Sequence, residues 1–528
     1  MISINFILTI LLTLVSAVYL VATYKVDLQM MQQNSYRNNR YFKWWKANNN
    51  YASISRITDL VMLLLLASTF PQYLTIPIVI IVFLVKSISL FRKKYKKPLV
   101  FTKRVWRLFI TMLVFSLLFL AGAFIGSGMM PVSLPLCISL LAVLSWIVLT
   151  FSNWAMVPVE RAINNMYVND AKQMLAQMPD MKIIGITGSY GKTSTKHYLN
   201  RILSEQFDVL MTPGSFNTPM GVVRTVREMM KPYNNVFIVE MGAKQLGDIK
   251  EICDIVHPEI GIITAVGEQH LESFKTIENV QRTKFELVEA LPENGFAVLN
   301  DDFEYVANRP VESAKAYRYA VQNTKNAAYT AKNIEYSEYG TRFTVAGEGH
   351  ELELNTKLVG ECNISNLMAA VIVAMKLGVS DDKIRYAVSK IEQVEHRLNM
   401  KRTPGGVTII DDAFNSNPDG SRMALDVLSR MTKGKRIVVT PGMIELGDKQ
   451  AYHNCRFGEH IAETCDVAII VGQYNREAIV EGIRKSGKFN ESNLVIVDSF
   501  AEAQTRLATL LKAGDTILYE NDLPDTFK

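Results

Sequence analysis

Apolar residues dominate the front of this 528-residue chain, whereas apolar and charged residues are mixed in the rest. Residues 1–24 and residues 108–159 carry no charge at all. A membrane-spanning helix needs roughly 20 apolar residues, and both stretches are long enough for that. After Glu160 the charges are spread as in a soluble enzyme. The pattern predicts a multi-pass α-helical membrane segment followed by a soluble part.

We expect about five membrane helices in residues 1–158 and a connecting helix over residues 159–180. The chain breaks at Pro71 and again between Gly126 and Pro131. Basic residues cluster at 37–46 and 92–107, and a hairpin of two short helices between these clusters keeps both on one side of the membrane, as the positive-inside rule favours. The expected spans are residues 4–24, 57–70, 73–91, 108–128 and 132–154. This threading predicts a bacterial cytoplasmic-membrane protein whose soluble part faces the cytoplasm.

Polar residues are scarce in the expected spans, and Asp59 lies near the end of one. Transporters usually carry ionisable groups at mid-membrane, so we expect an anchor instead, which could present a lipid-linked substrate. The net charge of +6 comes largely from the two basic clusters, which indicate contacts with membrane lipid and no nucleic-acid partner. The five cysteines show no disulfide or metal spacing and are typical of a reducing compartment.

Short apolar strands alternate with helical patterns from residue 181 onward, which predicts an α/β fold with a parallel sheet. Residues 329–359 switch to a period of two and indicate a small antiparallel addition. We place a central domain at 181–397 and a Rossmann-like C-terminal domain at 398–528. The expected parallel strands are residues 183–187, 236–240, 260–264 and 297–300 in the first domain, and 407–412, 436–440, 467–471, 494–497 and 516–519 in the second.

The segment GITGSYGKTST, residues 185–195, joins an apolar strand to a helix through a glycine-containing turn. Backbone N–H groups of such a turn can surround phosphate oxygens, Lys192 can reach the β and γ phosphates, and Thr193 can ligate magnesium. The fit to GxxxxGK[ST] is imperfect, because position 186 is Ile and Gly185 lies one residue early. The residues alone favour a phosphate loop of a P-loop domain over a chance glycine turn.

TGSYGKT, residues 187–193, resembles the TGTxGKT loop of the Mur ligase family, with Ser189 in place of the usual Thr. Similar motifs follow in the family's order: IVEMGAKQLGDI, ITAVGEQHLESF, RTKFELVEAL, AVLNDD, LVGECNISNLMAA, EHRL and IIDDAFNSNPDG. They look most like the MurF branch, which joins D-alanyl-D-alanine to UDP-MurNAc-tripeptide. The resemblance covers residue 181 to the C-terminus. It implies an ATP-dependent acid–amino acid ligase of peptidoglycan precursor synthesis that works through an acyl phosphate.

The resemblance also implies a site for ATP and two magnesium ions. Thr193 and Glu240 would ligate one ion, and His270 and Lys284, the latter as a carbamate, the second. Asn300 would contact adenine, Asp412 the ribose hydroxyls, and Arg397 the phosphates. The residues that would bind nucleotide are Thr187, Gly188, Ser189, Tyr190, Gly191, Lys192, Thr193, Ser194, Asn300, Arg397 and Asp412, and those with catalytic roles are Lys192, His270, Lys284 and Arg397. For Glu240 a strand-end helix cap stays open as the less favoured alternative, and for His270 and Lys284 the alternative is an ordinary solvated surface position.

Three asparagines fall where the family contacts substrate or shapes the domain junction: Asn217, Asn415 and Asn417. Asn363 and Asn366 match the family's HNxxN motif except that Cys362 replaces the usual His. A purely structural role is an equal alternative for all of them, because Asn is an ordinary turn residue.

Membrane helices stand here where soluble MurF-type enzymes carry the domain that grips the UDP-sugar. The carboxylate acceptor could therefore be a UDP-linked or a lipid-linked muramyl peptide, with a small-molecule amine as the second substrate. Two other functions stay open: a membrane-anchored Mur-type ligase of another polymer, such as a poly-γ-glutamate synthase, and a non-catalytic nucleotide-binding scaffold. Lys192, Glu240, His270 and Lys284 argue against the scaffold.

Overall fold

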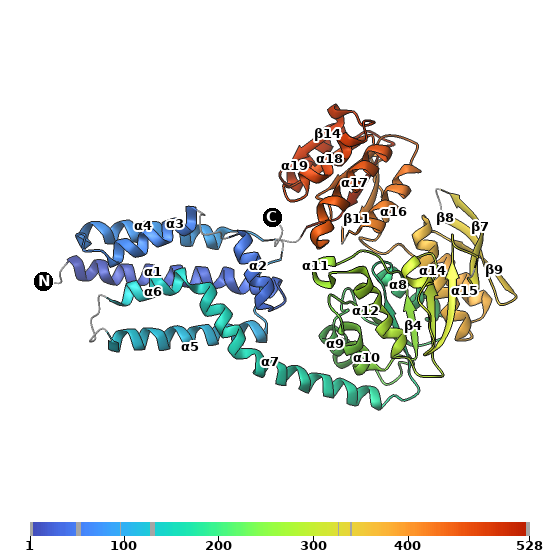
Figure 1. Ribbon diagram of the computed structural model, residues 1–528, viewed down its shortest axis with the longest axis horizontal. Coiled ribbons are helices and arrows are strands. Elements are labelled where there is room, and N and C mark those ends of the chain that lie inside the picture. Colours follow the sequence, from blue (N-terminus) through green and yellow to red (C-terminus); the bar gives the residue numbers. More distant parts are fainter. Residues whose placement is uncertain are drawn as a thin grey trace. The chain divides into compact units, whose positions relative to one another are not determined.

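The computed structural model describes residues 4–48, 54–95, 97–126, 133–325, 327–337, 340–414 and 416–523. These residues form two compact units, one over residues 4–165 and the other over residues 166–523. The described part of the first unit is helical, and the second unit contains two sheets with flanking helices (Figure 1).

Helices of the first unit are mostly apolar. Those over Phe6–Gln33, Gln72–Arg92 and Lys103–Gly126 are long and apolar enough to cross a membrane, and the pair Leu134–Val143 and Ser145–Ala176, bent by 73°, could provide a fourth crossing. The expected count of about five crossings stays a prediction, and most of the expected break at 126–131 lies outside the described residues. The helices are α1 (Ile4–Gln33), α2 (Asn38–Asn48), α3 (Ile54–Ala67), α4 (Gln72–Arg92), α5 (Lys103–Gly126), α6 (Ser133–Val143) and the first part of α7 (Ser145–Ala176).

An ion pair ties three of these helices together. Asp59 of α3 pairs with Lys86 of α4, and the hydroxyl of Tyr19 on α1 donates to Asp59 Oδ1 over 2.9 Å. Asp59 and Tyr19 are buried among the helices. A buried charge is tolerable in such surroundings only when it is paired, so Lys86 explains how the bundle accommodates Asp59.

Helix α7 is continuous from Ser145 to Ala176 and contains Pro158. The expected connecting helix over 159–180 is therefore the second half of α7. Its end lies against the central domain, where Arg227 forms an ion pair with Asp170 and stacks 4.2 Å from the ring centroid of Tyr167.

The central domain is built on a nine-stranded sheet of order β2-β3-β1-β4-β5-β6-β7-β8-β9. Strands β2 to β7 pair in parallel, and β7, β8 and β9 pair antiparallel. Both the predicted parallel sheet and the antiparallel addition are confirmed. The strands are β1 (Lys182–Thr187), β2 (Val209–Met211), β3 (Val236–Glu240), β4 (Ile260–Ile263), β5 (Phe296–Asn300), β6 (Lys315–Ala320), β7 (Tyr329–Ser337), β8 (Gly340–Gly347) and β9 (His350–Thr356).

Helices cover both faces of this sheet and bury two apolar layers. On one face Tyr198 and Leu199 pack against Leu367 and Met368, which joins α8 to α14. On the other face α9, α10 and α12 pack against the sheet with Val223, Ile252 and Phe285. The helices of this domain are α8 (Lys192–Leu203), α9 (Pro219–Met229), α10 (Asp248–Val256), α11 (Leu271–Phe274), α12 (Ile277–Glu289), α13 (Glu304–Ala307), α14 (Glu361–Lys376) and α15 (Asp381–Ser389).

The C-terminal domain has a six-stranded sheet of order β10-β11-β15-β12-β13-β14. Neighbouring strands of this sheet pair in parallel, except that β10 pairs antiparallel with β11. Strand β10 is thus an addition to the predicted parallel strands. Its strands are β10 (Asn399–Arg402), β11 (Thr408–Asp412), β12 (Arg436–Thr440), β13 (Val467–Val471), β14 (Leu494–Val497) and β15 (Thr516–Glu520). Its helices are α16 (Pro418–Ser429), η1 (Gly447–Lys449), α17 (Gln450–Thr464), α18 (Arg476–Lys485), η2 (Glu491–Asn493) and α19 (Phe500–Leu510).

Candidate active site

The predicted phosphate loop connects β1 to α8 and needs glycine at two positions. Gly188 has φ of 155°, and a Cβ there would lie 2.1 Å from Oγ1 of Thr264. Gly191 has φ of 81°, and a Cβ there would lie 2.2 Å from Oδ1 of Asn366. A side chain at either position would collide with its neighbour, so the loop conformation depends on both glycines. Gly185, the glycine that fits the motif imperfectly, lies inside β1.

Side chains of the loop fix its conformation from inside the protein. Thr187 donates to the carbonyl oxygen of Met241 over 3.0 Å. The buried Ser189 hydroxyl lies 3.0 Å from both the carbonyl oxygen and the amide nitrogen of Gly267, so it can donate to one and accept from the other. These hydroxyls hold the loop in place. Because both are engaged within the protein, the groups that could bind phosphate are the backbone N–H groups of the loop and the start of α8.

Lys192, the first residue of α8, folds back over the loop. Its Nζ donates to the carbonyl oxygen of Gly188 and, over 3.3 Å, to that of Ser189. The pKa of Lys192 is lowered to about 8, chiefly by burial; Glu240 opposes this effect and Arg397 adds to it. A lysine whose charge is poorly compensated in this way is suited to receive an anion.

Glu240, at the end of β3, lies beside the start of α8. Its Oε1 accepts from Thr193 Oγ1 over 3.2 Å and from Asn217 Nδ2 over 3.0 Å. Burial alone would raise the pKa of Glu240, but Lys196 and Lys192 lower it below its ordinary value. The carboxylate is therefore charged and directed at the loop. A role as a helix cap alone would not require a buried, charged carboxylate at this position.

Lys196, one turn after Lys192, is a residue that the motif comparison did not single out. It is fully buried, donates to the carbonyl oxygen of Gly214 over 2.7 Å, and places Nζ 2.9 Å from Glu240 Oε2. That ion pair lacks hydrogen-bond geometry at Oε2. Its sequence signal is the helical spacing, because residues four apart lie on one face of a helix.

His270 and Lys284 lie on neighbouring elements of the central domain. His270 precedes α11, and its Nδ1 contacts Glu445 of the C-terminal domain. Lys284, in α12, is buried, and its Nζ has no hydrogen-bond or ion-pair partner among the described residues. Burial lowers the pKa of Lys284 well below its ordinary value, and the charge of Lys192 adds to this effect. Burial lowers the pKa of His270; Glu445 opposes this effect, and Lys244 and Lys284 add to it. Lys284 therefore lies within electrostatic reach of both Lys192 and His270.

A pocket of about 190 Å³ opens beside the loop and is lined by both domains. Asn300, Arg397 and Asp412 all line it, together with Tyr190, Gly191 and Ser194 of the loop. Burial raises the pKa of Asp412 to about 6, against the effect of Arg397. Arg397 stacks 4.4 Å from the ring centroid of Phe414. The three polar residues expected to contact a nucleotide therefore share one pocket.

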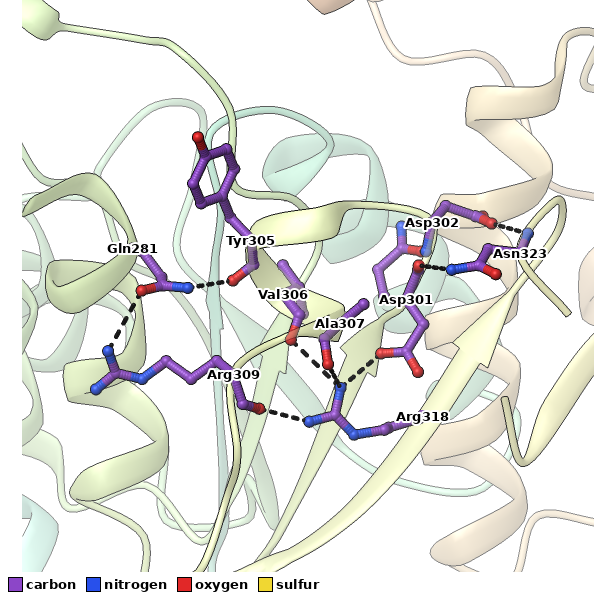
Figure 2. A network of polar contacts seen from close by, with 10 residues as sticks. Gln281, Asp301, Asp302, Tyr305, Val306, Ala307, Arg309, Arg318 and Asn323 are labelled. Carbon is purple, nitrogen blue, oxygen red and sulfur yellow. Dashed lines mark hydrogen bonds and ion pairs between the residues drawn. The ribbon is translucent and has the colours of Figure 1, made fainter. Parts of the chain in front are cut away.

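The turn after Asn300 is fixed by the polar network in Figure 2. Arg318 donates to Asp301 Oδ1 over 2.7 Å and to the carbonyl oxygens of Val306, Ala307 and Arg309. Asn300 itself donates to the carbonyl oxygen of Thr264 and to Ser365, both over 2.9 Å. The network holds β5 and β6 at the edge of the pocket and leaves Arg318 fully engaged.

The remaining asparagines differ in what they contact. Asn217 donates to Glu240, as described above, and Asn417 caps α16 by accepting from the amide of Gly420 over 2.9 Å while lining the pocket. Asn363 accepts from the Tyr198 hydroxyl and donates to the carbonyl oxygen of Val359, just before α14, so both contacts are internal to the domain although the residue also lines the pocket. Asn415 lies outside the described residues. Cys362, the departure from the family motif, lines the pocket, and burial raises the pKa of its thiol to about 12.

Whether magnesium fits can be judged from the donor atoms. No group of three or more His, Cys, Asp or Glu side chains that could hold a metal ion exists among the described residues. Thr193 and Glu240 nevertheless place two oxygen donors together beside the loop. Magnesium is commonly held by one or two protein oxygens together with substrate phosphates and water. The residues fit a metal site that is completed by a phosphate ligand.

Two family models match the second unit: the Mur ligase middle domain over residues 186–374, and the Mur ligase glutamate ligase domain over residues 396–519. A UDP-N-acetylmuramoyl-tripeptide–D-alanyl-D-alanine ligase of Mycobacterium bovis is 31% identical over 359 residues, which cover 64% of this chain and 70% of that relative. The chain belongs to the Mur ligase family. Another Mur ligase, the enzyme of that name from Escherichia coli, is 30% identical over 54% of this chain and 62% of its own length. The chain therefore spans somewhat less than two thirds of this relative.

Solved Mur ligase structures share the fold. MurF from Acinetobacter baumannii aligns with a TM-score of 0.62 and 26% identity, over 68% of this chain and 77% of that one. MurF from Thermotoga maritima, solved in complex with ADP, aligns with a TM-score of 0.61 and 24% identity, over 68% and 80% of the two chains. The Mur ligase fold explains why the loop, Glu240 and the pocket lie at the carboxyl ends of parallel strands, where α/β proteins bind ligands.

Proposed function

We propose that the chain is a MurF-like, ATP-dependent ligase that joins a carboxylate to an amine in peptidoglycan precursor synthesis. The observation that carries this proposal is the grouping of Lys192, Thr193 and Glu240 at a glycine loop beside a pocket that both Mur domains line. A scaffold that only binds nucleotide would not need a buried, charged Glu240 at the phosphate end of the site.

The chemistry follows from the weakness of a carboxylate as an acylating agent. One carboxylate oxygen attacks the γ phosphorus of ATP, and ADP leaves. The amine then attacks the carbonyl carbon of the resulting acyl phosphate, loses a proton, and expels inorganic phosphate together with the carboxylate oxygen. Lys192 would neutralise charge on the phosphoryl group during the first step, for which its weakly compensated ammonium is suited.

Thr193 and Glu240 are the residues that would hold magnesium at the phosphates, and His270 and Lys284 would hold a second ion. When bound, magnesium polarises phosphoryl oxygens and offsets their charge. Lys284 would have to become a carbamate to act as a ligand, and its low pKa favours the neutral amine that reacts with CO₂. The absence of a polar partner for Lys284 among the described residues supports such a modification.

The nucleotide would occupy the pocket beside the loop. Asn300 is suited to adenine because its amide has both a donor and an acceptor, and Asp412 to the ribose hydroxyls because it ends a strand opposite the loop. Arg397 would meet the phosphates from the domain boundary. Asn217 and Asn417, together with Asn415 outside the described residues, are the proposed substrate contacts.

The proposed acceptor is a muramyl peptide, either UDP-linked or lipid-linked, and the proposed amine is D-alanyl-D-alanine or a similar dipeptide. Large apolar side chains such as Leu64, Ile81 and Leu117 are exposed on the helical unit. Exposed apolar side chains on helices long enough to cross a membrane fit contact with lipid. Anchoring a cytoplasm-facing ligase in the membrane would raise its effective concentration toward a lipid-linked acceptor.

A reconstitution with purified components tests this function. Full-length protein in detergent is incubated with ATP, D-alanyl-D-alanine and either UDP-linked or lipid-linked muramyl peptide, and products are identified by mass. We expect an amide product with at least one acceptor, and none with Lys192→Ala. Absence of product with both acceptors, or normal turnover by Lys192→Ala, would contradict the proposal.

A further inference from the structure

Glu445 belongs to the C-terminal domain and contacts His270 of the central domain. It lies in the loop between β12 and η1, 175 residues from its partner. Its Oε2 contacts His270 Nδ1, its Oε1 accepts from Lys244 Nζ over 2.8 Å, and its carbonyl oxygen accepts from the amide of Glu272 over 3.1 Å. Three separate contacts thus fasten one residue to the central domain.

Backbone conformation indicates that this arrangement is imposed by its surroundings. Glu445 has φ of 62° and His270 has φ of 54°, both in the left-handed region that residues other than glycine seldom adopt. Such a conformation persists only where neighbouring contacts determine it, and it is frequent at functional sites. The neighbours of Glu445 supply those contacts, because Met443 and Leu446 on either side are buried in the C-terminal domain core.

The contact decides which nitrogen of His270 remains for a ligand. Nδ1 is engaged by Glu445, and Nε2 has no hydrogen-bond partner among the described residues. A histidine that ligates a metal usually donates its other ring N–H to a carboxylate, which fixes the ring orientation. The His270–Glu445 pair has this arrangement, except that the carboxylate comes from a different domain.

We propose that Glu445 is a positioning residue that orients His270 Nε2 toward the metal, so that the metal site is complete only when the two Mur domains are in contact. This inference rests on the proposed function, in which His270 is a metal ligand. Glu445 does not touch substrate or metal. Its role is to make metal binding depend on the position of the C-terminal domain.

Another pair of interdomain contacts provides the control. Glu268 of the central domain forms ion pairs with Lys449 and with His453, the latter over 2.7 Å. Lys449→Met breaks an interdomain ion pair close to Glu445 without touching His270. If Glu445 acts only by joining the two domains, Lys449→Met should weaken metal binding as much as Glu445→Ala does.

Binding of Mn²⁺ to the full-length protein in detergent, in the presence of a non-hydrolysable ATP analogue, measures the proposed role without turnover. Electron paramagnetic resonance reports the free ion. Loss of such a supporting carboxylate typically weakens metal affinity by about 10–100-fold, and we expect Glu445→Ala and His270→Ala each to do so. The double variant should bind no more weakly than His270→Ala, Glu445→Gln should lie between Glu445→Ala and wild type, and Lys449→Met should match wild type.

Several outcomes would overturn the proposal. These are unchanged Mn²⁺ affinity in Glu445→Ala, an equal loss in Lys449→Met, and a double variant whose loss is the product of the single losses. Unchanged affinity in His270→Ala would overturn it as well. Should Glu445→Ala fail to fold, the intermediate loss expected in Glu445→Gln carries the test, because its uncharged amide oxygen accepts from Nδ1 more weakly than the carboxylate does, and unchanged affinity in that variant would overturn the proposal. A wild-type protein that binds Mn²⁺ as expected but makes no amide product would instead contradict the proposed function alone.

Discussion

Lys192 and Lys196 lie one turn apart on α8, and we predict that replacing them by methionine changes stability in opposite directions. Burial lowers the pKa of Lys192 from an ordinary 10.5 to about 8. One pKa unit corresponds to about 1.4 kcal/mol, so keeping this charge in the folded protein costs on the order of 3 kcal/mol. Lost hydrogen bonds to the loop carbonyls, worth about 1 kcal/mol each, offset part of the gain. Lys192→Met should therefore stabilise the protein by about 1–3 kcal/mol at neutral pH.

Lys196 is the matched opposite case. It is fully buried against Glu240 and the carbonyl oxygen of Gly214. Removing one partner of a buried ion pair leaves the other charge uncompensated and typically costs about 3–5 kcal/mol. Lys196→Met should destabilise the second unit by that amount, although it resembles Lys192→Met in size and polarity.

The effect of Lys192→Met should also depend on pH. Because the folded-state pKa of Lys192 is lowered, its destabilising effect is complete below about pH 8 and fades as the pH rises toward 10.5. The advantage of the variant over wild type should follow the same course and disappear above about pH 10.5. An advantage that is constant across this range would mean that desolvation of the ammonium is not its cause.

Hydrogen exchange of peptides from β1 and α8, read by mass spectrometry on the full-length protein in detergent, measures these changes where they occur. Tryptophan fluorescence is unsuitable, because all five tryptophans lie within residues 1–165. Slower exchange in Lys192→Met and faster exchange in Lys196→Met would agree with the prediction. Faster exchange in Lys192→Met, or wild-type exchange in Lys196→Met, would refute the reasoning.

Three further predictions concern other parts of the chain. Gly188→Ala should abolish ATP binding in equilibrium dialysis, because its Cβ would lie 2.1 Å from Thr264 Oγ1, whereas Gly405→Ala, whose nearest neighbour is 3.9 Å away, should bind normally. Glu520→Gln should be more stable than wild type, by a margin that grows as the pH rises above about 5. Burial raises the pKa of Glu520, so above this pH the unfolded wild-type protein loses a proton that the folded protein keeps. Hydrogen exchange equal to wild type at pH values near 8 would contradict this. Lys86→Met should destabilise the helical unit by about 1–3 kcal/mol, because Asp59 loses its cation, and tryptophan fluorescence during denaturation should detect it.

Local patterns predicted the sheets of the second unit well. The expected strand at 236–240 coincides with β3, because a continuous run of buried apolar residues between polar turns is typical of a central parallel strand. The expected strands at 436–440 and 467–471 likewise coincide with β12 and β13. The grouping of Asn300, Arg397 and Asp412 in one pocket was expected from the resemblance to the Mur ligase family and not from a local pattern.

Contacts between distant segments could not be read from the sequence. The pairing of His270 with Glu445 depends on how the two Mur domains dock, and no local pattern encodes it. The burial of Lys196 also depends on tertiary structure, since a helix lysine is ordinarily solvated. The expected elements ended at residue 154 and began again at 159, yet α7 runs through this stretch without a break. Asn363 matched a family motif, yet its amide is engaged by Tyr198 and by the carbonyl oxygen of Val359.

Transfer of oxygen from the acceptor to phosphate tests the central claim most directly. The acceptor carboxylate is labelled with ¹⁸O, the full-length protein is supplied with ATP and D-alanyl-D-alanine, and the released phosphate is examined by mass. If the carboxylate is activated as an acyl phosphate, one labelled oxygen per amide formed should appear in inorganic phosphate. Amide formation with unlabelled phosphate would contradict the account, as would labelled product that forms without consumption of ATP.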